Sequence, residues 1–566
     1  MKSGRMDDNL AATCSHLYFA GNMSEQNPLP HTAGEPPHGA RRIAAEGRVS
    51  GIIVSVVCAA SLILSIIESR LNSDGHHWGL MYANAVDLVR GLVPYREIFV
   101  QYGFLTTLIQ GLSLFLFGNN VVSVGVITGI SYSVTLYLTY LLLRKVMRQW
   151  LACMSVVVMF LVHGYILYPW SNYFSYTFFL PVILFLTAQK PKPLHYLLAG
   201  VFLGLSFLAR QSLIPLLAPL YLYFLFPYVF PLHGMKKAGY RALGLFHAGL
   251  AGVLGIFILY LVLSSAFYDW YAQSFTLLGI YGKEFGGREL LSGFLRGVFL
   301  AHGYPFRDGR QMLYSIIFFN ALLIWLIVAW SLVRNKESER RNMLIFLFAS
   351  ITLFGYLQSF HIYEVFRLQN ASSLGIGLLL YSLDYCVAPF KRWKTAAFAV
   401  PVSCLVLYLG SHFLFIHTSS VYFPWDKKQL FGHGLREPRN IPILKGKLYD
   451  SSTINYYESL TAEINQYQGR LDYLVNYSNN SFVPLLSPAV KRVQRSPFYS
   501  KEFEQVLFNG ESESVGRLLR DGRAILTAGK PELVPPDYAV VLTLENPDLY
   551  LAIPAGIARH EDISTK

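Results

Sequence analysis

Charged residues are scarce in this sequence. Asp, Glu, Lys and Arg make up 14% of its 566 positions, whereas soluble domains carry about 25%. Hydrophobic residues reach 53%. This balance excludes an ordinary soluble globular domain and predicts an α-helical polytopic membrane protein. The net charge of +13 does not indicate nucleic-acid binding, because the basic residues form short clusters between apolar runs instead of one continuous face.

Cysteine is also scarce, with five residues in the whole chain. They lie in the N-terminal tail or in apolar runs, no two of them form a C-x-x-C pair, and none follows Cys404. The sequence therefore predicts neither a disulfide framework nor a zinc site.

Long apolar runs are plentiful. A transmembrane helix needs roughly 20 apolar residues, with a lower limit of about 17. We expect about 11 such helices, near residues 51–67, 120–143, 151–168, 173–188, 194–208, 212–231, 243–266, 311–333, 343–360, 371–390 and 395–417.

The basic residues predict the orientation of these helices. Short loops on one side hold clusters such as Arg144–Lys145 and Arg340–Arg341, whereas those on the other side hold only Arg210 and Arg367. Because Lys and Arg favour cytoplasmic loops, we expect the N-terminus inside and the C-terminus outside. If a further apolar run at 104–118 crossed the bilayer, every later loop would lie on the opposite side of the membrane. We therefore expect it to lie along the outer surface as an interfacial helix.

Three domains are expected. Residues 1–49 are polar and lack periodicity, which predicts a disordered cytoplasmic tail. Residues 50–417 form the transmembrane domain, with external loops at 68–119 and 267–310. Residues 418–566 contain helix-like stretches at 453–468 and 512–520, and strand-like stretches at 471–476, 524–527 and 538–544. They predict a small extracytoplasmic α/β domain.

The first external loop holds the most informative residues. Asp74, His76 and His77 follow the first apolar run closely, and a motif G-x-x-P-Y-R-x-x-F-x-x-Y-G covers 91–103. A polar cluster so close to a membrane predicts a site. This loop resembles that of the C-type integral-membrane glycosyltransferases, in the branch of aminoarabinose transferases and protein O-mannosyltransferases. The resemblance covers residues 51 to about 215.

The resemblance implies transfer of a sugar from a polyprenyl-phosphate carrier, with inversion at the anomeric carbon. Such a reaction needs a base for the incoming hydroxyl and cations for the departing phosphate. Asp74 would be the base, and its alternative role is to cap the following helix. His76 and His77 would bind substrate. A divalent metal on Asp74 and His76 is an alternative that we do not favour.

This chain departs from the family pattern in three places. Many members pair two acids in the first loop, whereas here Asp74 is followed by Gly75, His76 and His77. Asn172 stands where many members carry a second acid, and Gln101 falls near a lysine that meets the donor phosphate in the aminoarabinose branch. We expect both side chains, with Tyr102 of the motif, to contact substrate. The forked guanidinium group of arginine can bind two phosphate oxygens. We therefore expect outward-facing arginines to bind the donor phosphate. Candidates are Arg210, Arg96 and Arg367, although an arginine at the end of a span can simply reach to the interface.

The sequence therefore predicts a membrane glycosyltransferase acting on a cell-envelope glycan, lipid or protein acceptor, in a bacterial inner membrane. One alternative is an oligosaccharide polymerase or O-antigen ligase, whose key basic residues would lie in the loop 267–310. Another is a lipid-sugar transporter or flippase, which the scarcity of ionisable residues inside the spans disfavours.

Overall fold

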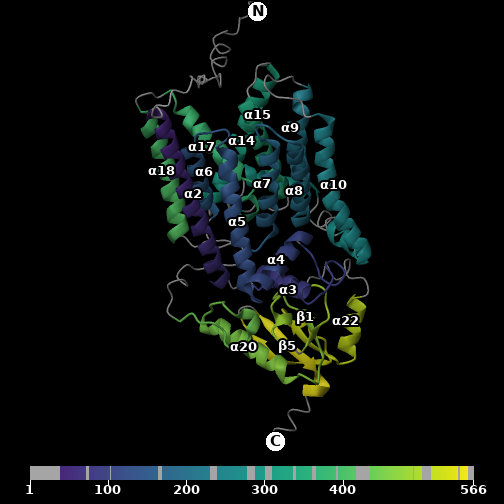
Figure 1. Cartoon of the computed structure of the whole chain (residues 1–566). Coiled ribbons are helices and arrows are strands. Elements are labelled where there is room, and N and C mark those ends of the chain that lie inside the picture. Colours follow the sequence, from purple (N-terminus) through teal and green to yellow (C-terminus); the bar gives the residue numbers. More distant parts are fainter. Residues whose placement is uncertain are drawn as a thin grey trace, which may run out of the picture. The chain divides into compact units, whose positions relative to one another are not determined.

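The computed structural model describes residues 38–71, 75–101, 103–163, 168–229, 239–276, 287–299, 309–334, 340–359, 365–389, 393–415, 434–488, 490–499, 511–545 and 548–558. Most of them are helical (Figure 1). The expected fold class, a polytopic helical membrane protein with a small C-terminal α/β domain, is confirmed.

Every predicted transmembrane segment coincides with a helix. These helices are α2 (His38–Leu71), α5 (Val121–Leu143), α6 (Gln149–His163), α7 (Ser171–Leu186), α8 (Pro193–Ala209), η1 (Gln211–Leu216) continuing as α9 (Leu217–Val229), α10 (Tyr240–Leu263), α14 (Gly309–Arg334), α15 (Arg340–Tyr356), α17 (Ser373–Cys386) and α18 (Lys394–Phe415). Within the described residues, 6 helices are long and apolar enough to cross a membrane by themselves, and the others are shorter apolar helices.

The N-terminal boundary differs from the prediction. Helix α2 begins at His38, inside the segment that we expected to be disordered up to residue 49, so that expectation is wrong for residues 38–49. The run from Ala40 to Arg48 is rich in Ala, Arg and Glu, which favour helix and outweigh the missing apolar periodicity. The rest of the predicted tail lies outside the described residues.

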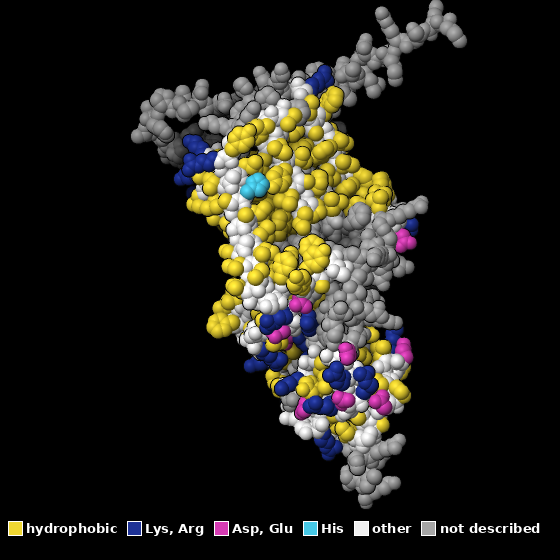
Figure 2. Space-filling view, turned by 90° about the vertical axis from the view of Figure 1, so that its right-hand side faces the viewer, with side chains coloured by type: hydrophobic (Ala, Val, Ile, Leu, Met, Phe, Trp, Pro, Cys, Tyr) yellow, Lys and Arg dark blue, Asp and Glu magenta, His cyan; other side chains and the backbone are white. Residues whose placement is uncertain are grey.

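The helices pack through small residues. A Cβ on Gly200 of α8 would lie 1.9 Å from the Phe246 carbonyl oxygen of α10, and one on Gly249 of α10 would lie 2.2 Å from the Leu197 carbonyl oxygen. The two backbones therefore touch, as is common where membrane helices associate. Hydrophobic side chains cover the visible face of the helical part, with charged side chains on the C-terminal domain and Lys and Arg at the other end (Figure 2).

The first external loop contains two helices, α3 (His77–Val89) and α4 (Phe104–Phe117). Helix α3 is buried over most of its length. Helix α4 has 14 residues. It exposes Leu112, Phe115 and Leu116 and buries the polar residues Thr106, Gln110 and Ser113. An exposed apolar side suits a helix in the membrane interface.

The residues between α3 and α4 explain the glycine at the end of the sequence motif. Gly103 has φ +117°, and a Cβ there would lie 2.2 Å from the carbonyl oxygen of Ala209. The loop thus touches the end of α8, where Thr106 also donates to the Ala209 carbonyl at 2.9 Å. The motif fixes the first loop against the end of α8.

The later loops contain short helices. The second external loop begins with α11 (Phe267–Tyr271) and a π-helical turn (Ala272–Thr276), and further on holds α13 (Gly287–Val298). Helix α15 ends in a 3₁₀ turn (Leu357–Ser359), which precedes α16 (Val365–Leu368).

The C-terminal domain is a five-stranded mixed sheet in the order β2-β1-β3-β5-β4. Its strands are β1 (Tyr473–Tyr477), β2 (Lys491–Arg492), β3 (Ala524–Ala528), β4 (Tyr538–Leu544) and β5 (Leu549–Pro554), and its longer helices are α20 (Ser451–Gln466) and α22 (Glu511–Arg520). β1 runs parallel to β2 and β3, whereas β5 is antiparallel to β3 and β4. The predicted helices and strands all occur within about two residues of their expected bounds, and β2 and β5 were not predicted.

Candidate functional site

The loop after Asp74 is held by the C-terminal domain. Asp74 itself lies outside the described residues. The next residue, Gly75, accepts a 2.8 Å hydrogen bond at its carbonyl from the Ser481 amide. A Cβ on Gly75 would lie 2.5 Å from Asn480 Oδ1, and one on Gly79 would lie 2.9 Å from the Ser481 Cβ. Two glycines of the loop are therefore needed for the C-terminal domain to come this close.

Helix α3 begins immediately after this contact. Its N-cap residue is His76, which makes no side-chain capping bond. Asp74 precedes the cap by two residues, so it does not occupy the position from which a side chain caps a helix. This placement weakens the capping alternative and leaves the predicted catalytic role of Asp74 as a proposal.

The two histidines face different neighbours. Their ring centroids are 4.6 Å apart, and the ring of His76 lies 4.5 Å from that of Phe498 in the C-terminal domain. The ring of His77 lies 5.1 Å from Trp170 and 5.6 Å from Tyr168. His77 therefore reaches the residues that precede α7, and His76 belongs to the domain interface.

Two of the predicted phosphate-binding arginines meet at the start of α7. Arg210 is only 8% exposed and donates from Nη1 to the Ser171 hydroxyl at 2.9 Å and from Nε to the Ser212 hydroxyl at 2.7 Å. The Arg367 guanidinium lies 5.8 Å from the centre of the Trp170 ring. Asn172 is buried in the first turn of α7. The structure thus brings His77, Asn172, Arg210 and Arg367 to one place.

The remaining candidates lie elsewhere or are outside the described residues. Arg96 donates to the Ser264 carbonyl at 2.9 Å and to Glu97 at 3.2 Å, so it caps the end of α10 and does not contact the histidine cluster. Gln101 has a buried Oε1 that finds no hydrogen-bond donor in the described part of the chain. Its neighbour Tyr102 is not among the described residues, and Gly103 beside it touches α8 just before Arg210.

Two buried charged residues near the loop were missed by sequence reasoning. Glu68, near the end of α2, is 5% exposed and lies within electrostatic reach of Tyr132 and Tyr173. An acid at the edge of an apolar run is the signal that could have found it. Lys447 is fully buried, and its Nζ donates to the Ser69 carbonyl at 2.9 Å and lies 5.3 Å from the Trp78 ring. No sequence pattern links it to the first loop.

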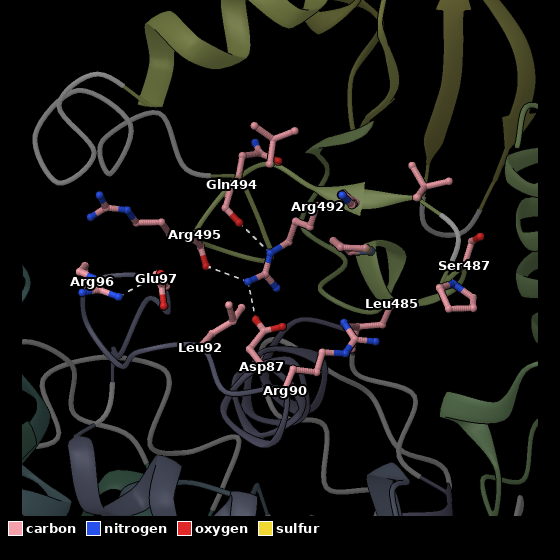
Figure 3. A pocket seen from close by; sticks show the side chains of 15 residues that line it. Asp87, Arg90, Leu92, Arg96, Glu97, Leu485, Ser487, Arg492, Gln494 and Arg495 are labelled. Carbon is pink, nitrogen blue, oxygen red and sulfur yellow. Dashed lines mark hydrogen bonds and ion pairs between the residues drawn. The ribbon is translucent and has the colours of Figure 1, made fainter. Parts of the chain in front are cut away.

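A cavity lies at the C-terminal end of α3. It has a volume of about 740 Å³, and its lining includes Asp87, Arg90 and Arg96 of the first loop and Arg492 and Arg495 of the C-terminal domain. Figure 3 shows Arg492 reaching from β2 to Asp87 of α3, with which it forms an ion pair. Arg495 forms a second pair with Asp269 of the second external loop at 2.6 Å. These two pairs fasten the C-terminal domain to both external loops.

The described residues contain no group of three or more His, Cys, Asp or Glu that could hold a metal ion. Asp74 is outside that set, so the Asp74–His76 alternative stays a prediction.

The arrangement of helices and sheet is similar to that of the solved structure of ArnT. The chain aligns with the crystal structure of ArnT from Cupriavidus metallidurans bound to undecaprenyl phosphate at a TM-score of 0.52 and 12% identity, covering 89% of this chain and 98% of that one. For the apo form of ArnT the TM-score is 0.50, at 12% identity and coverages of 90% and 98%. The oligosaccharyltransferase of Archaeoglobus fulgidus, in its apo form, aligns at 0.44 and 11% identity, covering 84% of this chain and 69% of that one.

The likeness to ArnT agrees, at the level of the fold, with the resemblance that the first loop indicated. No family model matches the chain, and no curated protein matches it by sequence.

Proposed function

We propose that the chain is a membrane glycosyltransferase that moves a sugar from a polyprenyl-phosphate donor to an acceptor hydroxyl, on the face that carries the C-terminal domain. The observation that supports this most is the convergence of His77, Arg210 and Arg367 on the start of α7. This point lies beside the loop that contains Asp74, in a fold shared with ArnT. ArnT was solved with undecaprenyl phosphate bound, and a carrier of that chemistry suits the site.

Asp74 acts as the general base. Its carboxylate is ionised at neutral pH unless strongly perturbed, and it takes the proton of the acceptor hydroxyl as that oxygen attacks the anomeric carbon. The bond between this carbon and the phosphate oxygen breaks, and polyprenyl phosphate leaves with the electron pair. Attack from the side opposite the leaving group inverts the anomeric centre.

The departing phosphate is stabilised by Arg210 and Arg367. Their charges lie at the N-terminal end of α7, where the helix dipole also favours an anion. Arg210 is held by two serine hydroxyls, so little reorganisation is needed when negative charge develops on the phosphate. Arg96 lines the cavity at the C-terminal end of α3 and donates to the Ser264 carbonyl, so we do not assign it to this phosphate.

The sugar is held by the groups around His77. Tyr168 and Trp170 are stacked with ring centroids 5.1 Å apart, and they offer an apolar face to a sugar ring. Asn172 and the histidines supply hydrogen bonds, and Gln101 and Tyr102 contact the donor from the first loop. The acceptor is a glycan, lipid or protein of the cell envelope. The enzyme works in a bacterial inner membrane with its C-terminal domain outside.

The test compares Asp74→Asn with Asp537→Asn, which removes a matched charge from an exposed position of the C-terminal domain. Each protein is reconstituted with a polyprenyl-phosphate sugar and an envelope extract as acceptor, and sugar transfer is measured. Loss of a general base typically costs about 10²- to 10⁴-fold, so Asp74→Asn should lose that much and Asp537→Asn almost nothing. Full activity in Asp74→Asn, or a larger loss in Arg296→Ala of the second loop, would contradict the proposal.

A further inference from the structure

A basic cavity lies at the end of the helical part that is farthest from the C-terminal domain. Its volume is about 600 Å³, and its lining includes Arg144, Lys145, Arg340 and Arg341. These residues follow the end of α5 or begin α15. The first turn of α5 touches the C-terminal domain, since a Cβ on Gly446 would meet Val122. Helix α5 has 23 residues, about 34 Å, so the cavity and the proposed active site are on opposite membrane faces.

Two of these four cations, Lys145 and Arg340, donate hydrogen bonds to the end of α7. The Lys145 Nζ donates to the Thr187 hydroxyl at 2.8 Å and to the Thr187 carbonyl at 3.1 Å. Arg340 Nη2 donates to the carbonyls of Thr187 and Ala188 at 2.8 and 2.7 Å. Both cations therefore cap the C-terminal end of α7, a position that favours positive charge. A helix end supplies only about half a negative charge, far less than four cations require.

The carboxylates that could balance the excess are absent from the described lining. The described residues that line the cavity include no Asp or Glu. Asp384 is the carboxylate to consider, because it interacts with Tyr381, whose ring lies 5.3 Å from the Arg341 guanidinium. It is already paired with Lys394 at 3.5 Å. Burial and the neighbouring Arg340 charge lower the pKa of Lys145 to about 8. A cation in this cavity is therefore costly, and a bound anion would lower that cost.

The same cavity has an apolar part. Leu141, Leu184 and Leu344, one from each of α5, α7 and α15, line it beside the basic residues. A soluble anion gains nothing from leucine, whereas a lipid places its phosphate on the cations and the start of its acyl chains on the apolar wall. Basic pockets between transmembrane helices suit lipid headgroups for this reason.

We propose that this cavity binds the phosphate headgroup of an anionic membrane lipid, from the leaflet opposite the C-terminal domain. Arg144 and Arg341 contact the phosphate, Lys145 and Arg340 hold the cavity open against the end of α7, and the three leucines receive the glycerol and first methylenes. The site is separate from the proposed transfer reaction and does not depend on it.

The test measures lipid binding and not activity. Arg144→Gln and the double variant Arg144→Gln/Arg341→Gln are purified in a neutral detergent and titrated with phosphatidylglycerol. Native mass spectrometry counts the lipid that each protein retains, and a thermal melt gives its unfolding temperature. Each basic residue near a lipid surface contributes enough to change affinity about five-fold. The matched control is Arg517→Gln, an arginine on the exposed face of α22.

We expect phosphatidylglycerol to raise the unfolding temperature of the parent and of Arg517→Gln, with about five-fold weaker binding in Arg144→Gln and weaker still in the double variant. Phosphatidylcholine and inorganic phosphate should have little effect. Equal lipid binding in all four proteins would overturn the proposal, and so would an equal rise with inorganic phosphate, because the lipid would then not be the occupant. If the double variant fails to fold, the single variant decides, because the side chain of Arg144 is exposed and lies over the Tyr140 ring instead of the end of α7.

Discussion

Arg210 Nη1 donates a 2.9 Å hydrogen bond to the hydroxyl of Ser171, and this bond joins the residue after α8 to the first residue of α7. The arginine is nearly buried and is also held by Ser212. Its charge is therefore fixed at the N-terminal end of α7. An arginine that merely reached for the membrane surface would be long, exposed and free to rotate, so this geometry favours the functional interpretation of Arg210.

Replacing Arg210 should lower the rate of transfer. Arg210→Gln removes the charge that we propose faces the departing phosphate, and hydrogen bonds to charged groups contribute about 1.5–3 kcal/mol. We expect kcat to fall about ten- to a hundred-fold, with Arg210→Lys losing less. Sugar transfer by the reconstituted variants measures this. Arg517→Gln serves as the control for loss of one positive charge, and unchanged kcat in Arg210→Gln would remove Arg210 from the mechanism.

A methyl group at Gly75 should disturb the loop that contains Asp74, the proposed base. The added Cβ would lie 2.5 Å from Asn480 Oδ1, and that oxygen accepts the Phe482 amide at 3.1 Å while Asn480 Nδ2 donates to the Tyr457 hydroxyl at 3.2 Å. Because Asn480 is fixed, the loop must move instead. We expect Gly75→Ala to lose at least about ten-fold in activity, since small displacements at an active site are costly.

The matched control for Gly75→Ala is Gly244→Ala in α10, where an added Cβ meets nothing within 4 Å. Alanine favours helix over glycine by about 1 kcal/mol, so this variant should keep its activity and gain slightly in stability. If Gly75→Ala also kept full activity, the contact between the C-terminal domain and the first loop would not matter for the reaction.

The sequence predicts the helices well and their contacts poorly. Apolar runs and turn residues are local signals, and they located every span and most of the C-terminal strands. Arg96 shows the limit, because its partner is the carbonyl of Ser264, far along the chain and invisible in any local pattern. The contact between Gly75 and Ser481 joins residues that are even farther apart in sequence.

The sequence predicted which residue types belong to the candidate site, but not which of those residues lie close together. Arg210 and Arg367 were chosen because they face outward, and the structure brings both to α7. Glu68 was missed because the first predicted span ended at residue 67, which made Glu68 the first residue of the loop and gave no reason to expect a buried carboxylate. Lys447 was missed because burial of a lysine by Trp78 and Tyr449 depends on tertiary packing.

Breaking the ion pair between Asp87 and Arg492 should loosen the C-terminal domain. Both side chains are largely buried, at 5% and 10% exposure, and removing one partner of a buried pair costs about 3–5 kcal/mol because the other charge stays uncompensated. We expect Asp87→Asn to speed hydrogen exchange in α3 and to lower the unfolding temperature. The double variant Asp87→Asn/Arg492→Gln should recover part of the loss.

The pair between Arg495 and Asp269 provides the comparison. Its side chains are 31% and 26% exposed, and solvent-exposed pairs contribute only about 0–1 kcal/mol. Arg495→Gln should therefore have a much smaller effect than Asp87→Asn, although both pairs join the same domains. Equal effects would mean that burial does not set the strength of this interface.

Helix α20 should weaken at low pH through its cap. The Asp450 side chain is the N-cap and accepts the Thr453 amide at 2.7 Å. This bond to the ionised form lowers the pKa of Asp450 below its usual value of 3.8. A carboxyl group with a lowered folded pKa stabilises the fold fully above the unfolded pKa, and the stabilisation is lost as pH falls through the folded pKa. The window therefore lies below about pH 4.

Hydrogen exchange in α20 measures this effect. Asp450→Ala should raise the exchange of the first-turn amides at pH 7, with a loss of about 1 kcal/mol of local stability. Below the window, the first-turn amides of the wild-type chain should be almost as poorly protected from exchange as those of Asp450→Ala. The protection in Asp450→Asn should be the same at both pH values, because an amide caps the helix without titrating. A wild-type protection pattern that stayed unchanged through acid would show that the carboxylate charge at Asp450 contributes nothing to the cap.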